Sequence, residues 1–426
     1  MTASPPTKPV GREEKHALLM AAAGFFCLMC GYYTLRPMRE ALALEVGVQR
    51  NSILFSVVLV CSAALLPIYW WLVGRTPRGR LLWYVFTPFA AVFVVLALGL
   101  HWYPRDKTLA FIYFVSLTSA NLYVISAFWS AMADVWRPEL AKRFYGYIAA
   151  GGSAGALLGP LIVTSLVRAV GPTPLIVFAC VSIMGTAGLV SAARASLRRS
   201  ASGRTVPDAA IPVGGRALDD LARLARTPYL LGIAGVIIAG QTIGAFMYNE
   251  QGKYVAQAYS AVADRAAIFA NMEIAVNLLS LFFQAVVVTW LTRRGSVALS
   301  FTAMPALIGA SFVALALFPA GSVLLVTQVL RRAADYGLGK PPREMLFTVL
   351  NPESKFKSKS LIDTVLQRGA DSAAQWLYVL IAGIGLVGIA WLCAGLCVVM
   401  MAATRTLGRS FEARQQPPGS TAGTAS

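Results

Sequence analysis

Residues 81–100 read LLWYVFTPFAAVFVVLALGL, a stretch without a single charged side chain. An α-helix of about 20 apolar residues is long enough to cross the hydrocarbon core of a bilayer. The stretch is continuously apolar and does not alternate with polar residues as a membrane β-strand would. It therefore predicts a membrane-spanning helix.

The composition of the whole chain agrees with this prediction. Of its 426 residues, 57% are hydrophobic and only 13% are charged, whereas roughly 25% are charged in an average soluble domain. Apolar runs of spanning length lie at roughly 17–36, 52–73, 81–100, 109–134, 144–168, 174–193, 229–249, 266–291, 297–318, 322–345, 360–382 and 384–403. We therefore expect an all-α polytopic membrane protein with twelve transmembrane helices.

The charge of the chain fits a membrane topology. There are 37 Lys and Arg against 19 Asp and Glu, a net charge of +18, which in a soluble protein would suggest a nucleic-acid partner. Most of these basic residues fall at the two ends of the chain and in connections on one predicted side of the membrane. By the positive-inside rule we expect both termini to be cytoplasmic in a bacterial inner membrane. The expected partner is then the lipid bilayer, without nucleic acid.

Several classes of chemistry lack the residues that they need. The chain has two histidines, His16 and His101, which lie in separate polar places, and its six cysteines all lie in apolar runs. Neither a histidine-based metal site nor a Ser-His-Asp relay fits this pattern. A phosphate-binding loop of the ATP-hydrolysing type is not found either. We expect no enzyme, no metal and no cofactor.

Polar segments divide the chain into five parts. The N-terminus and the C-terminal tail have compositions typical of disorder, and the central polar stretch combines a flexible linker with an amphipathic helix on the membrane surface. The expected parts are a disordered cytoplasmic N-terminus at 1–16, a six-helix half at 17–193, a cytoplasmic linker at 194–228, a second six-helix half at 229–404 and a disordered cytoplasmic tail at 405–426.

The two halves show an internal repeat. A shift of 214 residues places Pro138 and Glu139 on Pro352 and Glu353, and Gly155 on Gly369. Two six-helix pseudo-repeats in the same orientation are typical of the major-facilitator architecture, in which the halves rock about a substrate at the membrane midplane. The sequence thus predicts a major-facilitator-like fold and alternating access.

Charged residues within or at the mouths of the predicted spans are the candidates for substrate binding, because an ionisable group at bilayer depth costs about 2.5–3.5 kcal/mol. They are Arg36, Arg39, Glu250, Lys253, Arg331, Arg332, Asp335, Lys340, Arg343, Glu344, Arg368 and Asp371. Basic members predominate, which favours a small anionic substrate held by arginine forks. Glu273 and Asp371 are also candidates for proton coupling.

Structural roles remain open for some of these charged residues. Arg36 and Arg39 end the first predicted span, and Glu250 and Lys253 end the seventh. All four side chains could instead snorkel to the interface. Arg368 and Asp371 stand three residues apart and could neutralise each other on one helix face.

Three glycines, Gly151, Gly155 and Gly159, recur every fourth residue of the fifth predicted span. They form a smooth face that favours close helix packing.

Four stretches resemble the ATP/ADP translocase family of nucleotide exchangers. They are YYTLRPMREALALEVG from Tyr32, ELAKRFYGYIAAGGSAGALLG from Glu139, MYNEQGKYV from Met247 and KPPREMLFTVLNPESKFKSKSLIDTVLQRGAD from Lys340. The resemblance implies an antiporter that exchanges ATP and ADP, or another phosphorylated anion, by alternating access. It also implies that charged residues of the first, seventh, tenth and eleventh spans bind the phosphates. Separately, we expect a monomer.

Two other functions remain open from the sequence. One is a proton-coupled major-facilitator-type exporter of an unrelated small molecule, with Glu273 or Asp371 as the proton carrier. The other is a membrane sensor or assembly protein that transports nothing, although such a protein has little reason to bear the cost of charges at bilayer depth.

Overall fold

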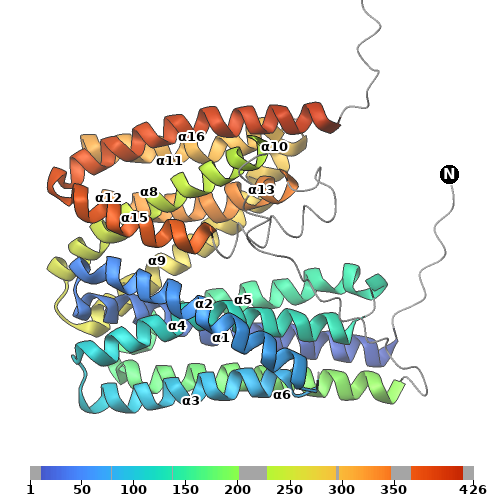
Figure 1. Cartoon of the computed structure of the whole chain (residues 1–426). Coiled ribbons are helices and arrows are strands. Elements are labelled where there is room, and N and C mark those ends of the chain that lie inside the picture. Colours follow the sequence, from blue (N-terminus) through green and yellow to red (C-terminus); the bar gives the residue numbers. More distant parts are fainter. Residues whose placement is uncertain are drawn as a thin grey trace, which may run out of the picture. The chain divides into compact units, whose positions relative to one another are not determined.

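The structure is a computed structural model of the chain, and it describes residues 11–77, 79–136, 138–200, 228–293, 297–346 and 366–415. Within these ranges every regular element is helical (Figure 1). The first group is α1 (Arg12–Val46), η1 (Val48–Arg50), α2 (Asn51–Arg75), α3 (Leu81–Trp102), α4 (Lys107–Val135), α5 (Pro138–Val170) and α6 (Pro172–Ser200). The second group is α8 (Pro228–Ala258), α9 (Val262–Phe282), η2 (Phe283–Val288), α10 (Thr289–Arg293), α11 (Val297–Leu317), α12 (Gly321–Ala334), η3 (Asp335–Gly339), α13 (Lys340–Leu346), α15 (Gln367–Ile381), η6 (Ala382–Ile384) and α16 (Gly385–Gln415).

The described residues contain six long helical segments before residue 200 and six helical segments after residue 228. Nine helical stretches are long and apolar enough to cross a membrane, one of which combines α15 and α16. The other two segments are α11, which is shorter, and the continuous run α12–η3–α13, which carries several charged residues. The predicted all-α fold with six helices in each half is therefore confirmed.

The first and last helices extend beyond the apolar runs that predicted them. α1 begins at Arg12, inside the expected disordered N-terminus, and the Glu14 carboxylate accepts a hydrogen bond from the amide of Gly11 at 3.0 Å. α16 continues to Gln415, where Phe411 is buried and Glu412 accepts a bond from the amide of Ala298 at 3.1 Å. A capping hydrogen bond thus accompanies the extended beginning of α1, and packing accompanies the extended end of α16. The expected amphipathic helix falls in 201–227, outside the described residues.

The described helices form two compact units. Unit 1 comprises the described residues of Met1–Val46, Val60–Ala210 and Ala261–Asn271, and unit 2 those of Gly47–Leu59, Ile211–Ser260 and Met272–Ser426. The division therefore passes through α2 and α9, and the beginning of each helix belongs to a different unit from the rest of it. The half boundaries expected from the sequence do not include this exchange, since apolar runs say nothing of which helices pack together.

The two exchanged segments are equivalent in the internal repeat. The shift of 214 residues found in the sequence carries Asn51 onto Arg265. Asn51 donates a hydrogen bond from Nδ2 to Oδ1 of Asn249 in unit 2 at 2.9 Å. Arg265 forms an ion pair with Glu45 in unit 1, with 2.6 Å between Nη1 and Oε1. Each exchanged segment is therefore joined by a side chain to the unit that contains it.

Within unit 1, α1 packs against α4, α5 and α6. The glycine face of α5 allows its closest approach: a Cβ on Gly151, Gly155 or Gly159 would lie 2.5, 2.2 or 2.5 Å from a carbonyl oxygen of α1. These carbonyls belong to Ala22, Phe26 and Cys30. The two backbones are therefore in direct contact.

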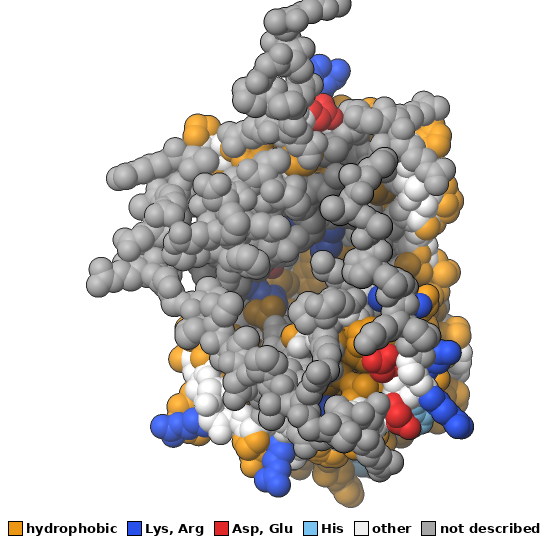
Figure 2. Space-filling model, turned by 90° about the vertical axis from the view of Figure 1, so that its right-hand side faces the viewer, with side chains coloured by type: hydrophobic (Ala, Val, Ile, Leu, Met, Phe, Trp, Pro, Cys, Tyr) orange, Lys and Arg blue, Asp and Glu red, His pale blue; other side chains and the backbone are white. Residues whose placement is uncertain are grey.

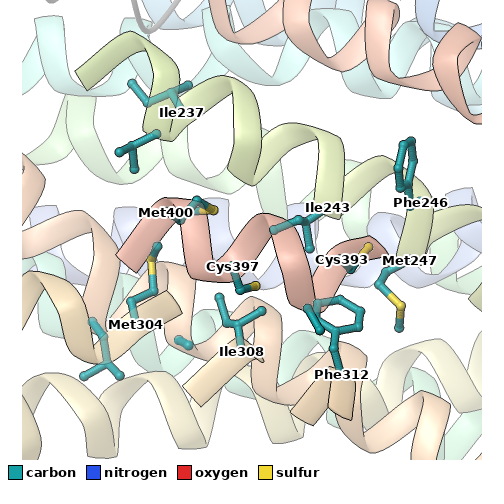
Figure 3. Close-up of a cluster of buried hydrophobic side chains, with 14 of the residues drawn as sticks. Ile237, Ile243, Phe246, Met247, Met304, Ile308, Phe312, Cys393, Cys397 and Met400 are labelled. Carbon is teal, nitrogen blue, oxygen red and sulfur yellow. The ribbon is translucent and has the colours of Figure 1, made fainter. Parts of the chain in front are cut away.

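Within unit 2, the core lies where α8, α11 and α16 pack together. Figure 3 shows Ile243 and Phe246 of α8, Ile308 and Phe312 of α11, and side chains of α16 that fill the space between them. The cysteines of this cluster, Cys393 and Cys397, are buried and free. They act as small apolar side chains.

Two short π-helical turns pack against each other in unit 2. η2 follows α9 and η3 follows α12, and a Cβ on Gly337 of η3 would lie 2.6 Å from Cβ of Phe283 in η2. π-helical turns inside α-helices often occur at functional sites. Here η3 begins at Asp335, three residues after Arg332 of α12.

Candidate functional site

The last turn of α12 presents two adjacent arginines to different partners. Nη2 of Arg332 lies 2.7 Å from Oε1 and 2.8 Å from Oε2 of Glu273 on α9. The Glu273 side chain is only 2% exposed and that of Arg332 only 12% exposed. Arg331 instead donates from Nε to Oε1 of Gln328, one turn back on α12, at 2.8 Å. Unit 2 thus contains a closed, buried ion pair beside an arginine that is held by a neutral amide.

A second carboxylate of unit 2 is Glu250 on α8. Its Oε1 accepts from Nζ of Lys253 at 3.1 Å and from the hydroxyl of Tyr378 on α15. The Lys253 ammonium also lies 5.0 Å from the centre of the Tyr378 ring. Tyr378 is buried, and it connects α15 to the polar end of α8. The Glu250 charge is therefore balanced within the unit.

The third carboxylate is Asp371 near the beginning of α15. Its Oδ1 accepts a hydrogen bond from Nε2 of Gln241 on α8 at 2.6 Å. The hydrogen bond that the structure gives Asp371 therefore comes from another helix and not from Arg368, its expected neighbour on the same face. Arg368 is half-buried.

The candidate arginines of α1, Arg36 and Arg39, belong to unit 1. The three carboxylates described above belong to unit 2. Arg39 donates from Nη1 to Oγ1 of Thr118 on α4 at 3.3 Å and pairs through Nη2 with Glu40. The Arg36 guanidinium lies 5.6 Å from the centre of the Tyr33 ring. Both arginines are engaged with side chains of their own unit.

The remaining candidates follow α12 toward the end of α13. Asp335 and Arg343 are half-buried, and Lys340 is exposed with its ammonium 4.6 Å from the centre of the Tyr336 ring. The side chain of Glu344 lies outside the described residues, as does most of the basic stretch that follows it. The structure therefore brings together candidates of α8, α9, α12 and α15, all within unit 2.

The sequence analysis did not predict the uncharged residues that hydrogen-bond to these charged groups. Gln241, Gln328 and Tyr378 are uncharged residues in mostly apolar runs, so the cost of a buried charge does not mark them. The available signal was the amide group itself, since an amide in a membrane helix seeks a hydrogen-bond partner on another helix.

Charged side chains also lie on the face drawn in Figure 2. Lys, Arg, Asp and Glu appear there among hydrophobic side chains, next to atoms that the structure does not describe. Among the described residues, no cluster of three or more His, Cys, Asp or Glu side chains could hold a metal ion.

Solved structures with a similar fold cover almost the whole chain. A POT family peptide transporter in complex with sulfate is 14% identical over 92% of this chain and 95% of its own, with a TM-score of 0.64. An auto-inhibited POT family peptide transporter is 13% identical over 96% and 99%, with a TM-score of 0.62. A bacterial homologue of the human lysosomal transporter Spinster, inward-facing and unoccupied, is 12% identical over 97% and 100%, with a TM-score of 0.55.

These likenesses define the fold class. The chain is an integral membrane protein with an all-α, major-facilitator-like fold. No protein-family model matches the chain. No curated protein matches it either.

The resemblance to ATP/ADP translocases is wrong. The structural neighbours are POT family peptide transporters and a Spinster homologue, and they do not support a nucleotide substrate or the antiport of nucleotides. The resemblance depended on four stretches that contain charged residues at or near the ends of membrane segments. A motif match in a single sequence, without a match of the whole chain, is weak evidence of family.

Proposed function

We propose that this chain is a secondary transporter that moves a small solute by alternating access and couples this movement to protons. The observation that carries the proposal is the ion pair between Glu273 and Arg332. It joins α9 to α12 inside unit 2, in helices that we place in the membrane. The bacterial inner membrane and cytoplasmic termini remain part of this proposal, as does a monomeric state.

Stability does not explain this ion pair. Removing two charges from water costs several kcal/mol per ion, and well-packed apolar side chains in their place are often equally or more stable. Ionisable groups inside membrane helices are accordingly associated with ion and proton pathways. The burial of Glu273 and Arg332 therefore supports a role in the transport cycle.

Protonation of Glu273 would convert this ion pair into a switch. A neutral carboxylic acid no longer attracts the Arg332 guanidinium by charge, so α9 and α12 would lose their ionic connection. A bound proton and the ion pair would then exclude each other. Proton coupling requires a contact with two states, here ion-paired and protonated, whose populations the proton shifts.

The fold likeness supports a small solute. The similar solved structures include POT family transporters in complex with 5-aminolevulinic acid, with alafosfalin and with sulfate. These are small polar molecules, and we propose a solute of comparable size for this chain.

The test uses the purified full-length chain in proteoliposomes that contain a pH-sensitive dye. Dialanine, 5-aminolevulinic acid and inorganic phosphate are added in turn, with the membrane potential clamped. We expect one of them to change the internal pH, and we expect Glu273→Gln to abolish this change while solute exchange continues. Glu14→Gln, at the exposed beginning of α1, is the matched control.

Two outcomes would contradict the proposal. Solute movement that needs a counter-solute and ignores the pH gradient would identify a solute exchanger without proton coupling. No movement of any of these solutes would favour a membrane sensor or assembly protein.

A further inference from the structure

One face of α16 changes from apolar to basic along the helix. Exposed side chains recur on this face at Trp391, Val398, Ala402, Arg405 and Arg409. Their spacing of three, four or seven residues keeps them on one side of a helix with 3.6 residues per turn. We call these five residues the exposed face of α16. Its first three members are apolar, and its last two are arginines.

The apolar part of the exposed face contacts the hydrocarbon of the membrane. Trp391 is 49% exposed and Val398 is 65% exposed, in a helical stretch long and apolar enough to span a bilayer. The helix rises about 30 Å from Gly385, where α16 begins, to Arg405. The hydrocarbon core is also about 30 Å thick. The two arginines therefore lie at the level of the lipid headgroups.

Packing against α11 holds the basic end of α16 as a regular helix (Figure 1). Phe411, on another face of α16, is buried. A Cβ on Gly408 would lie 2.3 Å from Cα of Ala298, at the beginning of α11. The helix then continues to Gln415. Both arginines are thus fixed one helical turn apart, with their side chains directed away from α11.

Within the described ranges, no ion pair involves Arg405 or Arg409, and both side chains are exposed. The one acidic residue of α16 is Glu412. Its carboxylate accepts the hydrogen bond from the amide of Ala298 at 3.1 Å. The described part of the chain therefore leaves both arginines available to an anion at the headgroup level.

We propose that Arg405 and Arg409 bind the phosphate of an anionic phospholipid whose acyl chains lie along the apolar part of the exposed face. Residues four apart on a helix are surface neighbours, so both guanidinium groups can reach one phosphate. Guanidinium forks match phosphate oxygens in geometry and charge. This inference requires only that the chain is a membrane protein, and it does not depend on the proposed transport function.

A phospholipid with a net negative charge complements this site better than a zwitterionic one. In phosphatidylcholine, the trimethylammonium group compensates the phosphate and would be repelled by the two arginines. Phosphatidylglycerol carries the same phosphate without a cation. Basic residues beside a membrane span attract anionic lipids for this reason.

The test measures lipid binding to the purified full-length chain in detergent by native mass spectrometry. The probes are phosphatidylglycerol and phosphatidylcholine with identical acyl chains. Two basic groups near a membrane surface together favour an anionic lipid by about thirtyfold. We expect the first phosphatidylglycerol molecule to bind more tightly than the first phosphatidylcholine molecule by this factor. Equal binding of the two lipids would overturn the inference.

Variants assign the preference to the two arginines. Arg405→Gln/Arg409→Gln should abolish it, and each single change should leave about a fivefold preference, the contribution of one basic group. The matched control is Arg12→Gln/Arg143→Gln, which removes two exposed arginines at the beginnings of α1 and α5, on the same predicted side of the membrane. We expect this control to keep the full preference. Equal preferences in the two double variants would overturn the inference.

Inorganic phosphate tests whether a free anion is sufficient. It has the phosphate chemistry of the lipid but no acyl chains to contact Trp391 and Val398. We therefore expect millimolar phosphate to leave phosphatidylglycerol bound. Displacement of the lipid by phosphate would assign the two arginines to a free anion and overturn the lipid site.

These measurements use neither a transported solute nor a pH gradient. A chain that prefers phosphatidylglycerol through Arg405 and Arg409 but moves no solute would contradict the proposed function alone. A chain that transports a solute with protons but does not distinguish the two lipids would contradict the lipid site alone.

Discussion

At the scale of single residues, Arg331 and Arg332 show how neighbours acquire different roles. Consecutive residues of an α-helix with 3.6 residues per turn point about 100° apart. Arg332 therefore meets Glu273 of α9, while Arg331 turns toward Gln328 and Gly244. The sequence predicted both as binding residues, but it could not assign their partners.

Removing one member of the buried ion pair should destabilise the protein more than removing both. Glu273→Ala leaves the Arg332 charge buried without its counter-ion, and such changes cost about 3–5 kcal/mol. We expect a clear fall in melting temperature in detergent for Glu273→Ala. The double variant Glu273→Ala/Arg332→Ala should recover part of this loss. A double variant that melts below both single variants would contradict a direct pair.

The hydroxyl of Tyr378 should stabilise the Glu250 carboxylate. Tyr378→Phe removes a hydrogen bond to a charged group, which contributes about 1.5–3 kcal/mol. We expect a lower melting temperature for Tyr378→Phe. Tyr103→Phe is the control, because Tyr103 is 68% exposed. Equal melting of the two variants would show that the Tyr378 hydroxyl contributes nothing.

At the scale of elements, the contact between α1 and α5 depends on glycine. The spacing of Gly151, Gly155 and Gly159 predicted a smooth helix face, and the structure places this face against the α1 backbone. The sequence could not identify α1 as the helix in contact, because a glycine face fits any neighbour. The exchange of the beginnings of α2 and α9 between the units was unpredictable for a similar reason. Hydropathy locates a helix but not its neighbours.

A methyl group at the centre of the α1–α5 contact should force the helices apart. The Cβ of Gly155→Ala would lie 2.2 Å from the carbonyl oxygen of Phe26, and neither backbone can yield easily. Overpacking of this kind costs about 1–3 kcal/mol. In the control Gly146→Ala, also on α5, the Cβ meets no atom within 4 Å. The thermal melt should fall for Gly155→Ala alone; equal melts would contradict the close contact.

At the scale of the whole molecule, composition and periodicity predicted the fold class well. Twelve apolar runs and a repeat offset of 214 residues correspond to helices in two halves. The candidate site was predicted in part, because the cost of charge in a membrane identified Glu273, Arg331, Arg332 and Asp371. Their neutral partners carry no such cost, so only the structure located them.

Family membership was the weakest inference from the sequence. Charged motifs suggested nucleotide exchangers, whereas the solved structures with a similar fold are POT family transporters and a Spinster homologue. A fold of this kind is determined by the apolar faces of many helices, which vary in sequence while keeping their pattern. A few charged motifs therefore say less about family than their appearance suggests.

The most direct test of the central claim measures protons and solute in the same proteoliposomes. Internal pH is followed by a dye while the uptake of a radiolabelled solute, found by screening, is sampled under an imposed pH gradient. We predict that the gradient drives solute accumulation with a parallel change of internal pH, and that Glu273→Gln abolishes both but retains solute exchange at zero gradient. Accumulation and a pH change that persist in Glu273→Gln, or uptake that is indifferent to the gradient in the unmodified chain, would contradict proton coupling through Glu273.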